Sequence, residues 1–462
     1  MASSPLAIIL AAGKGKRMGS DLPKVLLPVC GRPMLRYVID AVRAAGVERM
    51  VVVVGHRAEL VRSELASEPG VTFAEQAEQL GTGHAVMMCR DTLAAHQGPV
   101  LILAGDSPMV QVSSLQAVLA EFASQRPACL LGTASKPDPT GLGRIVRNAA
   151  GEFQAIVEEK DASPAERAIT EVNMSTYVFE SADLLWALDQ LKADNAQREY
   201  YLTDVIAMAV AEDVQVVTRQ PAALHEILGV NNKLDLANLE RTHQRNIAQL
   251  LLEQGVTLRD PARLDVRGEL QCGRDVVIDV NVIIEGKVTL GDGVQIGPNN
   301  YLRDVVIGAA TEVQPNCVVE EAEIGRDCRI GPFARVRPGS RLADHAHIGN
   351  FVEIKNSQIG EGSKANHLTY VGDSVVGKGV NIGAGTITAN YDGANKHRTD
   401  IRDNASIGSN VVLVAPVTVH EGATIGAGSV ITKDAPAGAL TLARTKQTTV
   451  SGWQRPKKKP KG

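Results

Sequence analysis

The stretch IGRDCRIGPFARVRPGSRLADHAHIGNFVEI, residues 324–354, places an aliphatic residue at every sixth position. These positions are Ile324, Ile330, Val336, Leu342, Ile348 and Ile354. A period of six is typical of a parallel β-helix, in which each unit forms a short strand with its aliphatic side chain directed into a common core. An all-β sandwich would instead show a period of two with irregular turns. The pattern therefore favours the β-helix.

The same period covers most of the second half of the chain. It includes Ile278, Ile284, Leu290, Ile296 and Leu302 before the quoted stretch, and, beyond a slip in register, Ile401, Ile407, Leu413, Val419, Ile425 and Ile431. The segment GTITANYDGANKHRTD, residues 385–400, does not fit the period. Insertions in repeat proteins form loops on one face, often the binding face, so we expect a binding loop there.

The first half of the chain, to about residue 230, alternates short β-branched runs with helical patterns. Strands are expected at LAIIL (6–10), RMVVVVG (49–55), VTFAE (71–75) and VLILAGD (100–106), and helices near 34–45 and 83–95. This alternation predicts βαβ units and a largely parallel sheet, whose ligands bind at the carboxyl ends of strands. The expected organisation is a first domain at 1–231, a linking helix at 232–254, a β-helix at 255–445 and a tail at 446–462.

Composition and charge argue against several classes of protein. The chain carries 48 basic and 52 acidic residues with a pI near 6.2, so no overall field favours nucleic acid. The closing KKKPK run is either a solvated tail or a weak contact for a polyanion. No apolar run approaches the roughly 20 residues of a membrane span, and the six cysteines form no C-x-x-C pair. We expect a cytoplasmic protein with reduced thiols and with no membrane or nucleic-acid partner.

The first expected strand runs into LAAGKGKRMGSDLPK, residues 10–24, which contains three glycines and four basic residues. Glycines let backbone N–H groups turn toward a ligand and basic side chains add positive charge, so a phosphate chain suits this loop. Neither G-x-x-x-x-G-K-[ST] nor G-x-G-x-x-G matches it, which argues against a P-loop ATPase and a dinucleotide-dependent dehydrogenase. The other interpretation is a glycine-rich connection without a ligand.

LAAGKGKRM followed by DLPK resembles the signature of the sugar-nucleotide pyrophosphorylases. The resemblance extends to QAEQLGTGHA (76–85), AGDSP (104–108), GLGRI (141–145), VEEKDA (157–162), EVNMS (171–175) and GVNN (229–232). With the β-helix, FVEIKNS, KANHLTYVGD and NIGAGTITANYDGANK, nearly the whole chain resembles a bacterial family of bifunctional uridylyl- and acetyltransferases. This resemblance implies an α/β Rossmann-like nucleotidyltransferase domain followed by a left-handed parallel β-helix. The implied product is UDP-N-acetylglucosamine, a precursor of cell wall and lipopolysaccharide.

The resemblance implies a site for uridylyl transfer from UTP to N-acetylglucosamine 1-phosphate. The triphosphate is expected on Gly13, Arg17 and Lys24, and the uridine among Leu10, Ala11, Gln76, Gly81 and Thr82. Asp106 and Asn231 match ligands for Mg²⁺, although the residues alone would also allow a turn at Asp106 and a helix cap at Asn231. Gly143, Glu158 and Asn173 match contacts of the sugar. Two departures bear on sugar selectivity: Ala104 stands where a larger residue is expected, and Met174-Ser175 replaces a small residue and a glycine.

The second implied reaction is acetyl transfer from acetyl-CoA to glucosamine 1-phosphate. An ammonium must lose a proton before it attacks a thioester, which suits His367, although a lone histidine is more often a solvated surface group. Arg337 and Lys355 are 18 residues apart, one triangular turn, and are expected to receive the sugar phosphate. Tyr370, Asn381, Lys396 and the pair Asn390-Tyr391 are expected to complete the pocket, the pair also being counted among the coenzyme A contacts with Ala384, Ser409, Ala427 and Arg444.

Two other interpretations differ in class. One is a single-activity nucleotidyltransferase whose β-helix serves only assembly, and His367 and the loop at 385–400 argue against it. The other is a non-catalytic sugar-nucleotide sensor, which Arg17, Lys24 and Asp106 argue against. The resemblance also implies a homotrimer with acetyl-transfer sites between adjacent β-helices.

Overall fold

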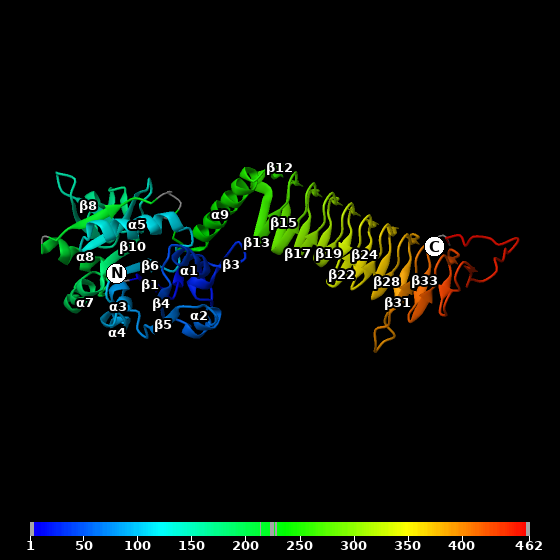
Figure 1. Ribbon diagram of the computed structural model, residues 1–462, viewed down its shortest axis with the longest axis horizontal. Coiled ribbons are helices and arrows are strands. Elements are labelled where there is room, and N and C mark those ends of the chain that lie inside the picture. Colours follow the sequence, from blue (N-terminus) through cyan, green and yellow to red (C-terminus); the bar gives the residue numbers. More distant parts are fainter. Residues whose placement is uncertain (1–3, 213, 222–225, 227–228, 459–462) are drawn as a thin grey trace. The chain divides into compact units, whose positions relative to one another are not determined.

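The computed structural model describes residues 4–212, 214–221, 226 and 229–458. Backbone contacts divide the chain into two compact units, Met1–His243 and Gln244–Gly462. The division falls within α9 (Lys233–Glu253), a helix of 21 residues at the place where the sequence predicts a long helix. Figure 1 shows the mixed sheet of the first unit and the stacked short strands of the second. Among the residues described, no helix has the length and apolar character of a membrane span.

The first unit is an α/β structure. Its strands are β1 (Leu6–Leu10), β2 (Pro28–Val29), β3 (Arg32–Pro33), β4 (Arg49–Val54), β5 (Val71–Glu75), β6 (Pro99–Ala104), β7 (Cys129–Ser135), β8 (Arg144–Arg147), β9 (Phe153–Val157), β10 (Glu171–Glu180) and β11 (Val216–Arg219). Its helices are α1 (Met34–Ala44), α2 (Ala58–Glu64), α3 (Thr82–Met87), α4 (Arg90–Ala94), α5 (Val112–Gln125), α6 (Pro164–Arg167), α7 (Ser181–Gln190) and α8 (Leu202–Ala211). The helix predicted near 83–95 is thus divided into α3 and α4.

The main sheet of this unit has the order β11-β7-β10-β6-β1-β4-β5. β1 pairs in parallel with both β4 and β6. The predicted, largely parallel sheet is confirmed, except that β10 runs antiparallel to its neighbours β6 and β7. The carboxyl ends of β1 and β6 therefore lie side by side, and the loops that follow them meet at one edge.

The central strand β1 is apolar on both faces because helices cover both sides of the sheet. Leu6 and Ile8 join a core with residues of α3, α4, α7 and α8, whereas Ala7 and Ile9 join a core with residues of α1, α2 and α5. Alternate side chains of a strand point to opposite faces, so an uninterrupted apolar run fits a strand buried on both. This arrangement fixes the position of the loop that begins at Leu10.

The second unit is a stack of coils with three faces. One face consists of β12 (Thr257–Leu258), β14 (Val277–Ile278), β16 (Gln295–Ile296), β18 (Glu312–Val313), β20 (Arg329–Ile330), β23 (His347–Asn350), β26 (Lys364–His367), β29 (Asn381–Ile382), β32 (Ser406–Ile407), β35 (Thr424–Ile425) and β37 (Leu440–Thr441). In the first coils, each long strand runs along one of the other two faces and continues onto the next. These long strands are β13 (Leu264–Cys272), β15 (Val282–Leu290), β17 (Tyr301–Ile307) and β19 (Val318–Ile324).

Beyond β19 these two faces separate. β21 (Arg335–Val336), β24 (Glu353–Lys355), β27 (Tyr370–Gly372), β30 (Ile387–Ala389), β33 (Val412–Val414) and β36 (Val430–Ile431) form one of them. The other consists of β22 (Ser340–Leu342), β25 (Gln358–Ile359), β28 (Ser374–Val376), β31 (Thr399–Ile401) and β34 (Val417–Val419). The strands within each face pair in parallel, as in Val336 with Ile354 and Thr399 with Val417. The predicted parallel β-helix is thus confirmed.

The register of the coils matches the sequence period. Arg329 pairs with His347 and His347 with Lys364, so successive coils take 18 and 17 residues. Every aliphatic position of the six-residue pattern is buried, from Ile278 to Ile431. Between Ser374 and its partner Thr399 the spacing is 25 residues. The extra residues follow β30 and precede β31, so the interruption expected at 385–400 is confined to 390–398.

Candidate functional sites

Four segments of the first unit bring polar side chains together beyond the carboxyl ends of β1 and β6. Lys24, in the loop after β1, forms an ion pair with Asp106, two residues after β6. The same ammonium donates to Asn231 Oδ1 at 3.3 Å, and Arg17 Nη2 donates to that oxygen at 3.2 Å. The predicted phosphate-binding cations and the predicted metal ligands thus form one group, called here the Lys24 cluster: Arg17, Lys24, Asp106 and Asn231.

Gly15 and Gly13 of the first loop differ in the space around them. Gly15 has a φ of 56°, and a Cβ at this position would lie 2.9 Å from the Cβ of Lys24. A side chain there would therefore displace Lys24, besides straining the backbone. Gly13 is exposed, and a Cβ there would meet nothing within 4 Å. Open space thus surrounds Gly13, where the triphosphate is expected.

The residues expected around the uridine lie at the end of β1 and before α3. Leu10 ends β1, and Ala11 follows it in the core. Gln76 is 3% exposed, and its Nε2 donates to Gly81 O at 3.0 Å. Thr82 begins α3, and its hydroxyl accepts a hydrogen bond from the N–H of Leu202 at 3.0 Å. Burial and these bonds hold the side chains of Gln76 and Thr82 in fixed positions.

Gly143, Glu158 and Asn173 also meet, as the resemblance implies. A Cβ on Gly143 would lie 3.4 Å from Glu158 Oε1 and 3.6 Å from Asn173 Cβ, and the Asn173 N–H donates to Gly143 O at 2.9 Å. The Asn173 side chain donates to Tyr177 Oη at 2.6 Å, which orients its amide. Burial raises the pKa of Glu158, and a hydrogen bond from Thr203 partly offsets this shift. An amide, a carboxylate and a missing side chain thus lie together at the place where the sugar is expected, called here the sugar pocket, and such groups can bond sugar hydroxyls and an acetamido group.

The two sequence departures lie at the end of β6 and within β10. Met174 packs on the α5 side of the sheet: its Sδ lies 3.6 Å from the place of a Cβ on Gly132. Ser175 has a φ of 56°, and its N–H donates to Asn173 Oδ1 at 3.1 Å. Ala104 ends β6 and is paired with Leu10. Met174 is thus directed away from Gly143. The backbone N–H of Ser175, through its hydrogen bond, helps to orient the Asn173 side chain.

The donor set of the Lys24 cluster fits a divalent cation. The Asp106 carboxylate and the Asn231 amide oxygen both face one cationic group, the Lys24 ammonium. Mg²⁺ prefers oxygen donors and is often held by one or two protein ligands together with substrate phosphates. In the described ranges no three His, Cys, Asp or Glu side chains gather as a metal site. A metal here would therefore take its remaining ligands from the nucleotide and from water.

In the second unit His367 ends β26 on an exposed corner. Its Nδ1 lies 2.8 Å from Oδ1 of Asn350, the register partner one coil earlier. An amide oxygen can only accept, so Nδ1 carries a proton and Nε2 of the neutral ring keeps its lone pair. In this tautomer Nε2 of His367 is free to accept a hydrogen bond or a proton.

Three cations gather on the neighbouring face. Arg337 Nη1 lies 2.7 Å from Glu353 Oε1, and Lys355 Nζ lies 3.4 Å from Asp373 Oδ2. Lys396, from the inserted loop, lies beside Lys355, and this neighbour lowers the pKa of Lys396. The three cations outnumber the two carboxylates, so the group, called here the Lys355 cluster, has the charge to bind a phosphate.

The other expected acceptor contacts are distributed around this cluster. Asn390 donates to Asp373 Oδ2 and lies 3.5 Å from the hydroxyl of Tyr370. The Tyr391 side chain is 61% exposed, and Asn381 is exposed on β29. Within the part of the chain that the structure describes, no hydrogen bond or ion pair joins His367 or Asn381 to the Lys355 cluster.

The expected coenzyme A contacts form a ladder on successive coils. The N–H of Asn410 donates to Ala384 O at 2.7 Å, and the N–H of Gly428 donates to Ser409 O at 2.9 Å. Arg444 Nη1 donates to Ala427 O at 2.7 Å. Ser409, Ala427 and Arg444 are exposed. The four positions thus form an accessible line of small side chains ended by a cation.

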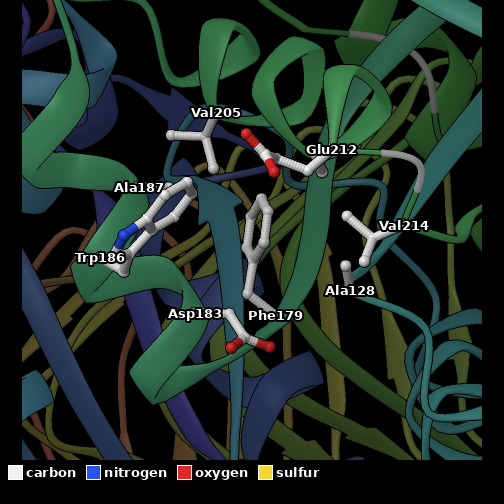
Figure 2. A pocket seen from close by; sticks show the side chains of 9 residues that line it. Ala128, Phe179, Asp183, Trp186, Ala187, Val205, Glu212 and Val214 are labelled. Atoms are coloured by element: carbon white, nitrogen blue, oxygen red, sulfur yellow. The ribbon is translucent and has the colours of Figure 1, made fainter.

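An apolar cavity of about 240 Å³ lies elsewhere in the first unit, between α7 and α8. Figure 2 shows Trp186 and Val205 at its wall and the carboxylates of Asp183 and Glu212 beside it. None of its lining side chains is a cation. The two carboxylates would repel phosphate, so we exclude this cavity as the nucleotide site.

Comparisons with known proteins agree with both halves of the chain. Residues 7–202 match the MobA-like NTP transferase domain family, and residues 321–356 and 398–433 match the bacterial transferase hexapeptide family (six repeats). The bifunctional protein GlmU of Cupriavidus pinatubonensis is 59% identical over 98% of this chain and 99% of its own length. The chain belongs to the GlmU family. GlmU proteins of Cupriavidus taiwanensis and Ralstonia nicotianae are 58% and 56% identical over the same shares.

Membership of the GlmU family makes the chain a bifunctional enzyme of UDP-N-acetylglucosamine synthesis. It is an acetyltransferase, which modifies glucosamine 1-phosphate, and a uridylyltransferase, which uses UTP. Nucleotide, acyl-CoA and sugar phosphate are therefore its substrates, and a metal cofactor is consistent with the nucleotidyltransferase domain. Both rival interpretations, the single-activity enzyme and the sensor, are wrong.

Sequence reasoning missed several side chains that support the sites. Asn350 precedes His367 by 17 residues, and Asp373 follows Lys355 by 18. Both intervals equal one coil, so the spacing could have revealed both residues. His84, whose Nδ1 lies 3.1 Å from Gln76 Nε2, gives no comparable signal because the contact depends on how α3 follows its loop.

Proposed function

We propose that uridylyl transfer takes place at the Lys24 cluster. The convergence of Arg17, Lys24, Asp106 and Asn231 at the carboxyl ends of β1 and β6 supports this assignment. An oxygen of N-acetylglucosamine 1-phosphate attacks the α-phosphorus of UTP, the bond to the β-phosphate oxygen breaks, and pyrophosphate leaves. The guanidinium and the ammonium offset the negative charge that develops on the phosphates.

Mg²⁺ is the proposed metal, with Asp106 and Asn231 as its protein ligands. When bound, it would supply Lewis-acid polarisation of the phosphate oxygens. The Gly143–Glu158–Asn173 pocket binds the sugar and Gln76, Gly81 and Thr82 hold the uracil, so that attack is in line.

A test of the metal ligands measures Mn²⁺ binding by ITC in the presence of a non-hydrolysable UTP analogue. Asn231→Ala should weaken this binding about tenfold, and unchanged binding would exclude Asn231 as a ligand.

For acetyl transfer, His367 is the proposed general base. Its Nε2 removes a proton from the ammonium of glucosamine 1-phosphate, and the neutral amine attacks the thioester carbonyl of acetyl-CoA. The carbon–sulfur bond then breaks, and the departing sulfur of coenzyme A ends as a thiol. The Lys355 cluster binds the sugar phosphate, and Arg444 binds phosphates of coenzyme A. The bond from His367 to Asn350 supports the assignment because it selects the tautomer that the reaction needs.

A homotrimer is the proposed assembly, in the cytoplasm. Phe333 and Phe351 stack at 5.2 Å on successive coils and are 50% and 55% exposed, and Leu368 continues the row at 63%. All three have positive φ, a backbone conformation that is uncommon for bulky residues, and each directs an apolar side chain to the surface. A second copy would cover this row and bring its own side chains toward His367. Phe351→Asp should give monomers in sedimentation and abolish acetyl transfer while uridylyl transfer persists; an intact trimer of the variant would show that this row is not the interface, and a monomeric unmodified enzyme would contradict the trimer.

A further inference from the structure

Arg144 is an unusually buried cation at the start of β8. Its side chain is 2% exposed, and Nη2 lies 2.6 Å from Glu159 Oε2. Nη1 donates to the carbonyl of Leu142, and Nη2 also donates to that of Arg167 at 3.4 Å. Nε has no partner within the described structure. The guanidinium is thus buried although its carboxylate partner stays 31% exposed, and an ion pair of this kind contributes little net stability relative to an apolar replacement.

The contacts of Arg144 join the two segments that border the sugar pocket. Glu159 Oε2 accepts the N–H of Gly141 at 3.2 Å in addition to the guanidinium. β8 and β9 pair with Arg144 opposite Val157, and beyond this pairing the ion pair and the Gly141 hydrogen bond join the loop that precedes β8 to the segment that follows β9. Gly143 lies within the first segment, and Glu158 lies within the second. The guanidinium thus holds the backbone on both sides of the pocket.

We propose that Arg144 is a positioning residue that sets the distance between Gly143 and Glu158 and thereby the fit of the N-acetylglucosamine moiety. This inference rests on the proposed sugar pocket. The described contacts of Arg144 are backbone carbonyls and the Glu159 carboxylate, so its effect on the sugar is indirect. Loss of the guanidinium should widen the pocket without altering the Lys24 cluster. Sugar affinity should fall, whereas UTP affinity and acetyl transfer should persist.

The experiment compares Arg144→Met with Arg147→Met in the full-length enzyme. Arg147 lies on the same strand and pairs with Glu171 at 2.7 and 2.6 Å, so its replacement removes a similar ion pair without touching the pocket. Arg144→Met should raise the KM for N-acetylglucosamine 1-phosphate about tenfold, because it removes a buried charge-assisted contact. The KM for UTP, the acetyl-transfer rate and all constants of Arg147→Met should change less than about twofold.

Two further variants keep the inference testable if Arg144→Met does not fold. Glu159→Gln preserves the shape and one acceptor oxygen but removes the charge, and Arg144→Lys preserves the charge but not the planar two-donor geometry of the guanidinium; each should raise the same KM by a smaller factor. An unchanged sugar KM, or equal rises for sugar and UTP, would overturn the proposal. Asn173→Ala separates the two failures. If it raises the sugar KM and Arg144→Met does not, only the positioning role is wrong; if neither does, the pocket assignment is wrong.

Discussion

The two candidate sites are built in opposite ways. The Lys24 cluster joins residues up to 214 positions apart, because parallel strands bring the loops at their carboxyl ends together. The two ion pairs of the Lys355 cluster and the His367–Asn350 pair join residues 16 to 18 positions apart, because each coil stacks on the previous one, and only Lys396 reaches this cluster from the inserted loop. In the β-helix, contact follows from spacing along the chain. In the α/β unit it follows from strand order, which spacing does not contain.

The comparison implies that each site can be removed without loss of the other. Asp106→Ala should lower uridylyl transfer about 10²–10³-fold, because the variant loses the proposed metal ligand and the ion-pair partner of Lys24. Acetyl transfer should be unchanged. Pyrophosphate release measures the first activity and coenzyme A thiol the second. Asp189→Ala removes an exposed carboxylate paired with Arg90 and is the matched control. A loss of both activities in Asp106→Ala would show that the units are coupled.

In the β-helix, the effect should be confined to one corner of the coils. Lys355→Ala should raise the KM for glucosamine 1-phosphate roughly 30-fold, since it removes a phosphate contact and leaves Asp373 without its ion pair. Lys378→Ala removes an exposed lysine paired with Glu361 on the same unit and should leave this KM unchanged. A similar rise in both variants would indicate a general effect of charge.

The pH dependence of phosphate binding sharpens the assignment of Lys396. Neighbouring Lys355 lowers the pKa of Lys396. The Lys396 ammonium is therefore deprotonated at a lower pH than the ammonium of an ordinary lysine, whose pKa is about 10.4. Phosphate binding needs this charge and should weaken as pH rises toward that value. The inhibition constant of N-acetylglucosamine 1-phosphate against acetyl transfer measures it. The arginine of Lys396→Arg keeps its charge over this pH range, so the inhibition constant of this variant should not rise with pH. If the variant and the unmodified enzyme showed the same pH profile, Lys396 would not be the titrating group.

The smallest effect is expected at Ser175, one of the departures from the family pattern. Its backbone N–H, rather than its side chain, holds Asn173, and glycine would retain this bond while relieving the positive φ. Ser175→Gly should therefore change the KM for N-acetylglucosamine 1-phosphate less than about twofold. A larger change would mean that the hydroxyl contributes to sugar selectivity.

The period of six predicted the β-helix and its core because burial repeats with the coil. It also located the inserted loop, although β30 continues to Ala389 and the interruption is shorter than the mismatch in sequence. The alternation of the first half predicted the parallel pairing of β1, β4 and β6. It did not predict that β10 runs antiparallel, since an apolar sequence is compatible with either strand direction in a sheet.

The resemblance supplied site residues that the patterns alone left open. Asn231 is a helix cap by sequence, and its contact with Lys24 depends on the path of the chain before α9. Arg144 gave no signal, because a single arginine in a strand is usually exposed and its burial arises from the packing of three segments. Asn350 and Asp373 were predictable in principle, from the coil spacing.

The independence of the two sites is tested most directly by His367→Ala in a paired assay on one preparation. Acetyl-CoA consumption with glucosamine 1-phosphate should fall at least about 10²-fold. Pyrophosphate release from UTP and N-acetylglucosamine 1-phosphate with Mg²⁺ should equal that of the unmodified enzyme. If both activities fell together, or if acetyl transfer survived, His367 would not be the base of a separate site and the account would be wrong.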